Sequence, residues 1–309
     1  MAGKLGIWIE AARPKTLAAA VVPVMVGTAA AVAAGKVDPV AAMTCLAFAL
    51  LIQIGTNFAN DYYDFVRGAD TAERVGPRRA VAAGLVPAST MRGAMTGVFA
   101  AAFVVGLFLM YRFAGGWPGL MAGRGLGLLA IGIVSIVSGI AYTGGPFPLG
   151  YNGLGDLFVF VFFGLVAVNT TYFVQAGELA SNPVAASIGV GLLAANILVA
   201  NNYRDAETDA RAGKRTLVVR FGRRFAGSQY AVSNGLAMAC PMAMWMQGSH
   251  PWVLLPLLLA PWTWRLTRRL SASRDPREQI AILGATAATL AAYGVLQSAG
   301  LILAARAGR

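Results

Sequence analysis

The chain has 309 residues, of which 57% are hydrophobic and 12% are charged, and its mean hydropathy is +0.63. Soluble domains carry about 25% charged residues, so this composition excludes a soluble globular protein and predicts an integral membrane protein in a lipid bilayer. The net charge of +12 comes without a nucleic-acid-binding motif, and the basic residues lie between apolar runs, so we expect no nucleic-acid partner.

Few residues suit catalysis by a thiol or an imidazole. Cys45 and Cys240 both lie inside apolar runs, which argues against a disulfide framework or a zinc site. His250 is the single histidine. The sequence therefore offers no Ser-His-Asp set and no two-histidine metal site.

Apolar runs follow one another along the whole chain, after an N-terminal segment that we expect to lie at the membrane interface. A helix crosses the hydrocarbon core in about 20 residues. The runs cover residues 17–34, 40–57, 91–111, 125–142, 154–175, 183–202, 225–247, 252–270 and 279–305. We predict an all-α polytopic protein with nine transmembrane helices around a central cavity, forming one membrane-embedded domain over residues 1–309.

Positive charge is distributed unevenly between the two sides that these nine runs define. The N-terminus and the connections after the second, sixth and eighth runs hold 20 of the 25 Lys and Arg residues. Positively charged connections stay in the cytoplasm. We therefore place the N-terminus and these connections on the cytoplasmic side of the cell (inner) membrane.

The first polar cluster, NFANDYYDFVRGAD, covers residues 57–70 and follows the second run. Asn57, Asn60, Asp61 and Asp64 are three or four residues apart, so on a helix they share one face. A charge at the centre of a membrane helix costs roughly 2.5–3.5 kcal/mol, and part of that cost remains near the end. These side chains therefore require a compensating ligand or partner.

The second polar cluster, NNYRDAETDARAGKR, covers residues 201–215 and follows the sixth run on the same side of the membrane. Asp205 and Asp209 share a helix face, and Asn202 and Tyr203 precede them. Mg²⁺ removes the repulsion between the carboxylates, because it binds carboxylate oxygens. Phosphate oxygens and water usually fill its remaining coordination positions. Two Asp pairs facing each other across a cavity predict magnesium ions that bridge a diphosphate.

Cations beside both clusters indicate an anionic substrate. Arginine pairs with phosphate oxygens through its planar fork, and lysine supplies a point charge. The candidates for phosphate binding are Arg67, Arg78, Arg79, Lys214 and Arg215.

Two further polar segments lie between and within the apolar runs. Residues 142–156, YTGGPFPLGYNGLGD, predict a turn-rich connection in which Tyr142 is placed to donate to a phosphate. The fifth run contains a polar stretch that includes Tyr172 and Gln175. Because polar residues are costly against lipid, we expect this stretch to face a cavity or neighbouring helices.

These residues resemble the UbiA-type intramembrane prenyltransferases, whose two Asp-rich motifs bind prenyl diphosphate through magnesium. The segments Asn60 to Asp64 and Asp205 to Asp209 match those motifs, and the likeness extends over the nine runs. Within that family, the Arg-Pro-Lys-Thr-Leu segment at 13–17, the Gly-Pro-x-Arg segment at 76–79 and the Thr-Tyr-x-x-Gln segment at 171–175 are similar to the branch that prenylates 1,4-dihydroxy-2-naphthoate in menaquinone biosynthesis. Gly68 stands where other branches carry a third carboxylate, and Asp70 follows two residues later.

The resemblance implies a reaction and a set of roles. A polyprenyl diphosphate would lose its diphosphate, and the aromatic acid would be prenylated with loss of carbon dioxide. Lys15 or Arg79 would bind the aromatic carboxylate. The implied metal ligands are Asn60, Asp61, Asp64, Asp70, Asp205 and Asp209.

Other functions remain open at this point. Another aromatic acceptor, such as homogentisate, 4-hydroxybenzoate or haem, would use the same diphosphate site. A transporter of an anionic solute would also place charge near interrupted helices. Prenyl chain length and oligomeric state are not defined by the sequence.

Overall fold

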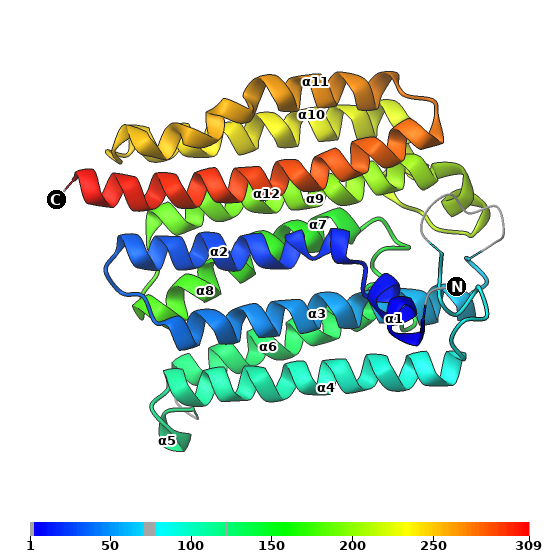
Figure 1. Cartoon of the computed structure of the whole chain (residues 1–309), viewed down its shortest axis with the longest axis horizontal. Coiled ribbons are helices and arrows are strands. Elements are labelled where there is room, and N and C mark those ends of the chain that lie inside the picture. The colour runs from blue at the N-terminus through cyan, green and yellow to red at the C-terminus, as the bar shows by residue number, and fades with distance from the viewer. Residues whose placement is uncertain (1–2, 71–77, 121–122, 309) are drawn as a thin grey trace.

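The computed structural model describes residues 3–70, 78–120 and 123–308, and within these ranges the regular structure is entirely helical. The long helices run along one common direction, side by side (Figure 1). Gly76 and Pro77, which belong to one of the segments behind the expected family likeness, lie outside the described residues.

The N-terminal segment is broken before it enters the helical bundle. The short α1 (Lys4–Ala12) is followed by η1 (Pro14–Thr16), a single 3₁₀ turn, and then by α2 (Ala18–Ala33). The direction changes by 53° at the break. Arg13 sits at this break with φ of 52°, a left-handed conformation that is uncommon for a residue with a side chain. The break keeps α1 at one end of the bundle (Figure 1).

The first half of the chain forms one group of packed helices. Its members are α3 (Pro39–Val66), α4 (Ala88–Phe113), the short α5 (Trp117–Leu120) and α6 (Gly123–Ala141). Helix α3 packs on both α4 and α6. Asp38 begins α3, because its Oδ1 atom accepts hydrogen bonds from the backbone N–H groups of Val40 and Ala41.

The fifth apolar run is one continuous but irregular helix. It consists of α7 (Gly155–Val159), the π-helical segment η2 (Phe160–Val166) and α8 (Ala167–Ala176). The η2 segment packs closely on α9 (Ser181–Arg211), since a Cβ atom on Gly164 would lie 2.6 Å from the Cα atom of Gly191. Glycine at both positions permits this approach of the two backbones.

The second half of the chain forms the other group. Besides α9, it contains α10 (Leu217–Met246), η3 (Pro251–Leu259), α11 (Ala260–Ala272) and α12 (Pro276–Ala307). Helix α12 packs on α9 and on α2, and α2 also contacts α3 and α8. Helices α2 and α8 therefore connect the two groups.

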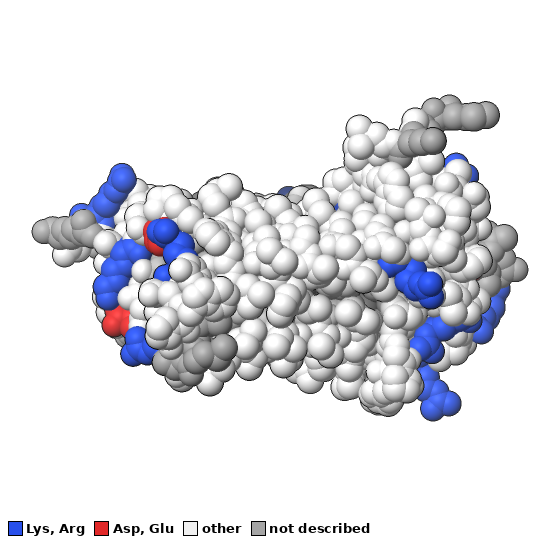
Figure 2. All heavy atoms as spheres, turned by 90° about the horizontal axis from the view of Figure 1, so that it is seen from below, with Lys and Arg blue, Asp and Glu red and all other residues white. Residues whose placement is uncertain are grey.

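All nine predicted runs fall on helical elements, but fewer are long and apolar enough to span a membrane. Among the described residues six segments qualify: α3, α4, α6, α7 to α8, α9 and α12; a seventh is added if the bent α1–α2 pair counts as one span. Helix α10 has a non-helical residue at Gly222, and the eighth run is divided between η3 and the basic α11. That nine helices span the membrane therefore stays a prediction. Figure 2 shows a face whose middle is free of Lys, Arg, Asp and Glu between two charged ends, as membrane embedding requires.

Both predicted polar clusters lie at the same end of the molecule. The end of α3, the start of α7, the end of α9 and the start of α10 meet there (Figure 1). This meeting point is the candidate site.

Candidate active site

The four side chains predicted to share one face of α3 have different partners. Asn57 donates from Nδ2 to the carbonyl oxygen of Ala12 at 2.9 Å and to Thr16 at 3.2 Å, so it holds the N-terminal segment. The Oδ1 atom of Asn60 accepts from the hydroxyl of Thr143 at 3.0 Å. Asn57 and Asn60 therefore contact different segments of the protein, the N-terminal segment and the connection after α6.

Asp61 accepts hydrogen bonds from the backbone of the connection that follows α3. Its two carboxylate oxygens accept the N–H groups of Ala80 at 2.9 Å and Val81 at 3.0 Å, and its side chain is buried. This is the geometry of a capping carboxylate at the start of a turn. In this structure Asp61 organises the connection, whereas the predicted metal role stays a prediction.

Asp64 is the centre of the site. It is only 1% exposed, which requires compensation for its charge. Arg79 lies 2.9 Å from Oδ2, the hydroxyl of Tyr151 donates to Oδ1 at 2.7 Å, and Lys214 Nζ lies 3.3 Å from Oδ1. Three donors from three separate segments thus converge on this one carboxylate.

The two Asp-bearing helices end in the same way. Gly68 and Gly213 follow Asp64 and Asp209 by four residues, and both have a left-handed backbone, with φ of 67° and 73°. The next N–H group then bonds back to the Asp carbonyl, at 2.8 Å after α3 and at 2.9 Å after α9. Glycine is favoured at such helix ends. The turn after α9 brings Lys214 back over its own motif.

Lys214 is shared by the two motifs. Its Nζ atom lies 3.3 Å from Asp64 Oδ1 and 3.7 Å from Asp209 Oδ1. The two carboxylate oxygens are therefore at most about 7 Å apart. The predicted meeting of the first and second motifs is found, with an ammonium group between them.

The other polar residues of the second motif are buried or paired within the protein. Arg204 binds both carboxylate oxygens of Asp205 at 2.7 Å, and it also bonds to Asn201 at 2.9 Å. Tyr203 is buried among the apolar side chains of α9, α10, α11 and α12, with Arg223 over its ring. Asn202 is partly buried. Asp209 is accordingly the member of this motif that faces the first motif.

The five predicted phosphate cations differ in exposure. Arg79 is 7% exposed and pairs with both Asp64 and Asp70, the latter at 3.4 Å. Arg67 donates to the carbonyl oxygen of Gly145 and lies over the ring of Tyr151, 5.4 Å from its centroid. Arg78 and Arg215 are exposed.

Lys15 is also exposed, on η1. It is therefore open to an incoming anion, as are Arg78 and Arg215.

Three residues of the site were not among the predicted side chains. Tyr151, in the turn-rich connection, reaches Asp64 and Lys214. Arg13, at the break between α1 and α2, is a charged neighbour of the phenol of Tyr142. Asp156 is buried on the first turn of α7, beside Gln229. The only sequence signal for Tyr151 and Asp156 was their place in a polar segment next to apolar runs, whereas Arg13 belongs to the segment 13–17 that resembles the family.

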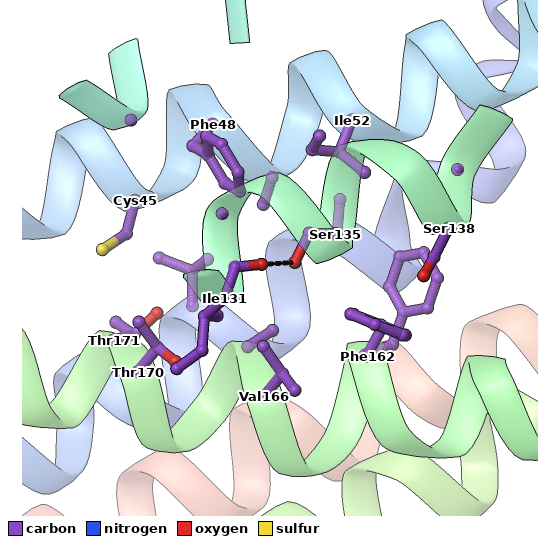
Figure 3. A pocket seen from close by; sticks show the side chains of 18 of the residues that line it. Cys45, Phe48, Ile52, Ile131, Ser135, Ser138, Phe162, Val166, Thr170 and Thr171 are labelled. Atoms are coloured by element: carbon purple, nitrogen blue, oxygen red, sulfur yellow. Dashed lines mark hydrogen bonds between the residues drawn. The ribbon is translucent and has the colours of Figure 1, made fainter. Parts of the chain in front are cut away.

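An apolar cavity of about 1130 Å³, including its open side, lies next to these groups. Thr56 and Tyr142 line the end nearest the charged residues, and Cys45, Leu109 and Met110 line the other end. Figure 3 shows Phe48 and Ile52 of α3 and Ser135 and Ser138 of α6 on one side, with Phe162, Val166, Thr170 and Thr171 opposite. Ile131 of α6 also lines the cavity, and it is 38% exposed.

Two predicted binding residues lie far from the charged residues. Gln175 accepts from the backbone N–H of Asp38 at 3.3 Å, at the start of α3. Helix α3 rises about 1.5 Å per residue, so Asp38 and Asp64 are about 39 Å apart. Tyr172 is 3% exposed and belongs to the core that α2, α8, α9 and α12 form. The structure does not bring these two side chains to the end of the molecule where the two Asp motifs meet.

The donor groups at the site suit magnesium chemically. Carboxylate oxygens from Asp64 and Asp209 and the amide oxygen of Asn60 are hard ligands of the kind that Mg²⁺ binds. Among the described residues, no three His, Cys, Asp or Glu side chains are grouped closely enough to hold a metal ion. The protein's own cations, Arg79 and Lys214, neutralise the carboxylates instead.

Comparisons with known sequences agree along nearly the whole chain. The sequence model of the UbiA prenyltransferase family matches residues 20–289. A 1,4-dihydroxy-2-naphthoate octaprenyltransferase from Haemophilus influenzae is 36% identical over 303 residues, which cover 97% of each chain. An enzyme of the same name from Mycobacterium tuberculosis is 39% identical over 277 residues, covering 89% of this chain and 90% of that one.

Solved structures show the same fold. A UbiA homolog from Archaeoglobus fulgidus, bound to DMAPP and Mg²⁺, superposes with a TM-score of 0.64 at 18% identity, over 94% of this chain and 99% of that one. The apo structure of a UbiA homolog from Aeropyrum pernix has a TM-score of 0.65 at 14% identity, over 92% and 97% of the two chains. The helical arrangement is therefore shared at low sequence identity.

Proposed function

The chain belongs to the UbiA prenyltransferase family, and from this premise we propose that it transfers a polyprenyl group from prenyl diphosphate to 1,4-dihydroxy-2-naphthoate with loss of carbon dioxide. The product of that reaction is demethylmenaquinol. The observation that carries the proposal is the position of the charged site at one end of an apolar cavity. A substrate with a diphosphate head and a hydrocarbon tail requires these two environments side by side.

The choice of acceptor rests on the relatives. Several of them, at 32–39% identity, are named for 1,4-dihydroxy-2-naphthoate. Homogentisate, 4-hydroxybenzoate and haem are the alternatives within the family. Lys15, exposed on η1, is our proposed partner for the naphthoate carboxylate, because Arg79 is engaged with Asp64 and Asp70.

The diphosphate would bind between the two motifs. Lys214, which contacts both motifs, and Arg67, which lies over the ring of Tyr151, would bind its phosphate oxygens. The exposed Arg78 and Arg215 are further candidates. Asn60, Asp64 and Asp209 would hold Mg²⁺, with Asp61, Asp70 and Asp205 supporting them. Magnesium, when bound, neutralises the charge that builds on the departing diphosphate. Homologs of known structure bind Mg²⁺ together with DMAPP or GPP.

The chain's own residues then direct the reaction at the cavity mouth. Loss of diphosphate leaves an allylic cation, and the ring carbon that bears the carboxylate attacks it. Phe158 and Phe162, whose ring centroids are 5.8 Å apart, line the cavity near Tyr142. Aromatic faces stabilise a nearby cation by about 0.5–2 kcal/mol. The apolar lining also keeps water from the cation.

The hydrocarbon tail would occupy the cavity and then leave it. From Thr56 to Cys45 the cavity follows α3 over roughly 16 Å, at about 1.5 Å per residue. The relatives are named for an octaprenyl group, whose extended chain is longer than this stretch of the cavity. We propose that the rest of a long tail passes between α6 and the η2–α8 segment into the lipid.

The membrane orientation follows the distribution of positive charge. We propose that the site faces the cytoplasm across the inner membrane. A transporter of anions is less well supported, because the far end of the cavity is lined by apolar side chains such as Leu109 and Met110.

The acceptor is tested directly with purified protein in lipid. The protein is supplied with a polyprenyl diphosphate and equal amounts of 1,4-dihydroxy-2-naphthoate and 4-hydroxybenzoate, and the products are identified by mass spectrometry. We expect prenylated, decarboxylated naphthoquinol. A preference for 4-hydroxybenzoate would overturn the assignment of the acceptor and leave the diphosphate site untouched.

A further inference from the structure

Tyr151 connects the two Asp-bearing helix ends through both its side chain and its backbone. Its hydroxyl donates to Asp64 Oδ1 at 2.7 Å, which reaches the end of α3. Its carbonyl oxygen accepts the N–H of Arg215 at 2.7 Å, which reaches the segment after α9.

The ring of Tyr151 also lies under the cations of the site. Lys214 Nζ is 4.8 Å from the ring centroid, and the guanidinium carbon of Arg67 is 5.4 Å from it. A cation within about 6 Å of an aromatic face is attracted to it. One side chain therefore fixes an anion through its hydroxyl and two cations through its ring.

The connection that bears Tyr151 is held at several points. Leu149 and Gly150 donate their N–H groups to the carbonyls of Ala141 and Tyr142, both at 2.9 Å. On the other side, Arg220 of α10 donates to the carbonyl of Asn152 at 2.9 Å. Tyr151 is thus supported by the end of α6 and the start of α10, and neither of these carries the motif carboxylates.

We propose that Tyr151 is a positioning residue that holds Asp64 and Lys214 in register, and thereby sets the affinity of the site for diphosphate with its metal. This inference rests on the proposed function. Tyr151 does not line the cavity, so it acts through Asp64 and Lys214 and not on the reacting carbon.

Two substitutions separate the hydroxyl from the ring. Tyr151→Phe removes the bond to Asp64 and keeps the ring, while Tyr151→Leu removes both. The measurement is calorimetric titration of the full-length protein in lipid nanodiscs with inorganic pyrophosphate and Mg²⁺. Because a hydrogen bond to a charged group is being lost, we expect about tenfold weaker binding in Tyr151→Phe. In Tyr151→Leu we expect the affinity for pyrophosphate to fall roughly a further threefold, because the contact between the ring and the cations is also lost.

A matched control distinguishes positioning from a general loss of stability. Tyr230→Phe removes another buried tyrosine hydroxyl, which contacts Thr286 at 2.8 Å between α10 and α12. We expect this variant to bind pyrophosphate as the unmodified protein does. The KM for the aromatic acceptor should be unchanged in both Phe variants, since Tyr151 does not contact the acceptor.

A double-mutant cycle tests the link to Lys214. When Lys214 is replaced by Gln, the Tyr151→Phe and Tyr151→Leu variants should bind pyrophosphate with nearly the same affinity, because the cation that the ring contacts is gone. Equal affinity in Tyr151→Phe and the unmodified protein, or the same loss in Tyr230→Phe, would overturn the inference. Failure of the unmodified protein to bind pyrophosphate with Mg²⁺ would instead overturn the proposed function.

Discussion

Lys214 Nζ lies 3.3 Å from the Oδ1 atom of Asp64, although the two residues come from opposite halves of the chain. The same ammonium group lies 3.7 Å from Asp209. One lysine therefore joins the ends of α3 and α9 and neutralises a buried carboxylate. The proposed diphosphate site is therefore formed jointly by the two halves of the chain.

Replacing Lys214 should weaken the binding of diphosphate. Lys214→Gln removes a cation that is 18% exposed and lies within reach of the space between the motifs. We expect the KM for prenyl diphosphate to rise roughly tenfold, because a charge-assisted contact is lost. Steady-state kinetics at saturating naphthoate measure this. Lys36→Gln, at the other end beside Glu178, is the control and should leave the KM unchanged.

Asp61 should behave as a structural cap. Its carboxylate accepts the N–H groups of Ala80 and Val81, and asparagine preserves much of such a cap. We expect Asp61→Asn to keep most of its thermal stability, whereas Asp61→Ala loses about 1–2 kcal/mol. The midpoint of thermal unfolding in detergent reports the difference. A complete loss of activity in a fully stable Asp61→Asn protein would restore the metal role that was predicted for this residue.

Arg79 should be essential for stability. It is 7% exposed and is paired with the buried carboxylates of Asp64 and Asp70. Removing one partner of a buried ion pair costs about 3–5 kcal/mol. We therefore expect Arg79→Met to lower the unfolding midpoint strongly, and Arg79→Met with Asp64→Asn to recover part of the loss. Arg112→Met, at the opposite end beside Asp38, should lower it far less, because that pair is solvent-exposed.

Filling the cavity should affect long donors more than short ones. Gly132 lines the cavity on α6, and a Cβ atom there would meet nothing within 4 Å. We expect Gly132→Leu to reduce turnover of an octaprenyl donor at least tenfold relative to a geranyl donor, since the added side chain takes the space of the distal tail. Gly127→Leu, on the same helix but outside the cavity lining, is the matched control. Equal losses for the two donors would contradict the proposed path of the tail.

Much of this architecture was predictable from the sequence. Apolar runs identify the helices because the bilayer demands continuous hydrophobic segments. The two motifs were expected on the same side because Lys and Arg avoid translocation. The apolar runs and the distribution of Lys and Arg place both Asp motifs at one end of the molecule. Because a buried charge is costly without a partner, the approach of Lys214 to Asp64 and Asp209 was then to be expected. Six or seven segments among the described residues are long and apolar enough to span a membrane, so the predicted nine spans stay a prediction. The run over residues 252–270 contains Pro256 and is divided between η3 and α11.

The partners of individual side chains were less predictable. Helical spacing indicates which residues share a face, but not which segment packs against each of them. Asp61 and Asn57 therefore received ligand roles, although the structure pairs them with backbone groups of other segments. Gln175 was assigned to the substrate from its polarity and from its place in the segment that resembles the family, and it bonds at the other end of α3. Tyr151 was missed because a turn-rich connection has no periodicity to indicate where its side chains point.

The most direct test compares the unmodified protein with Asp64→Asn and Asp209→Asn in lipid nanodiscs. Each is supplied with a polyprenyl diphosphate and 1,4-dihydroxy-2-naphthoate, with Mg²⁺ or with excess chelator, and the prenylated product is quantified by mass spectrometry. We predict product only with Mg²⁺, and a rate at least 100-fold lower in both variants. Full activity in the chelator, or in either variant, would contradict the assignment of these two carboxylates to a shared metal and diphosphate site.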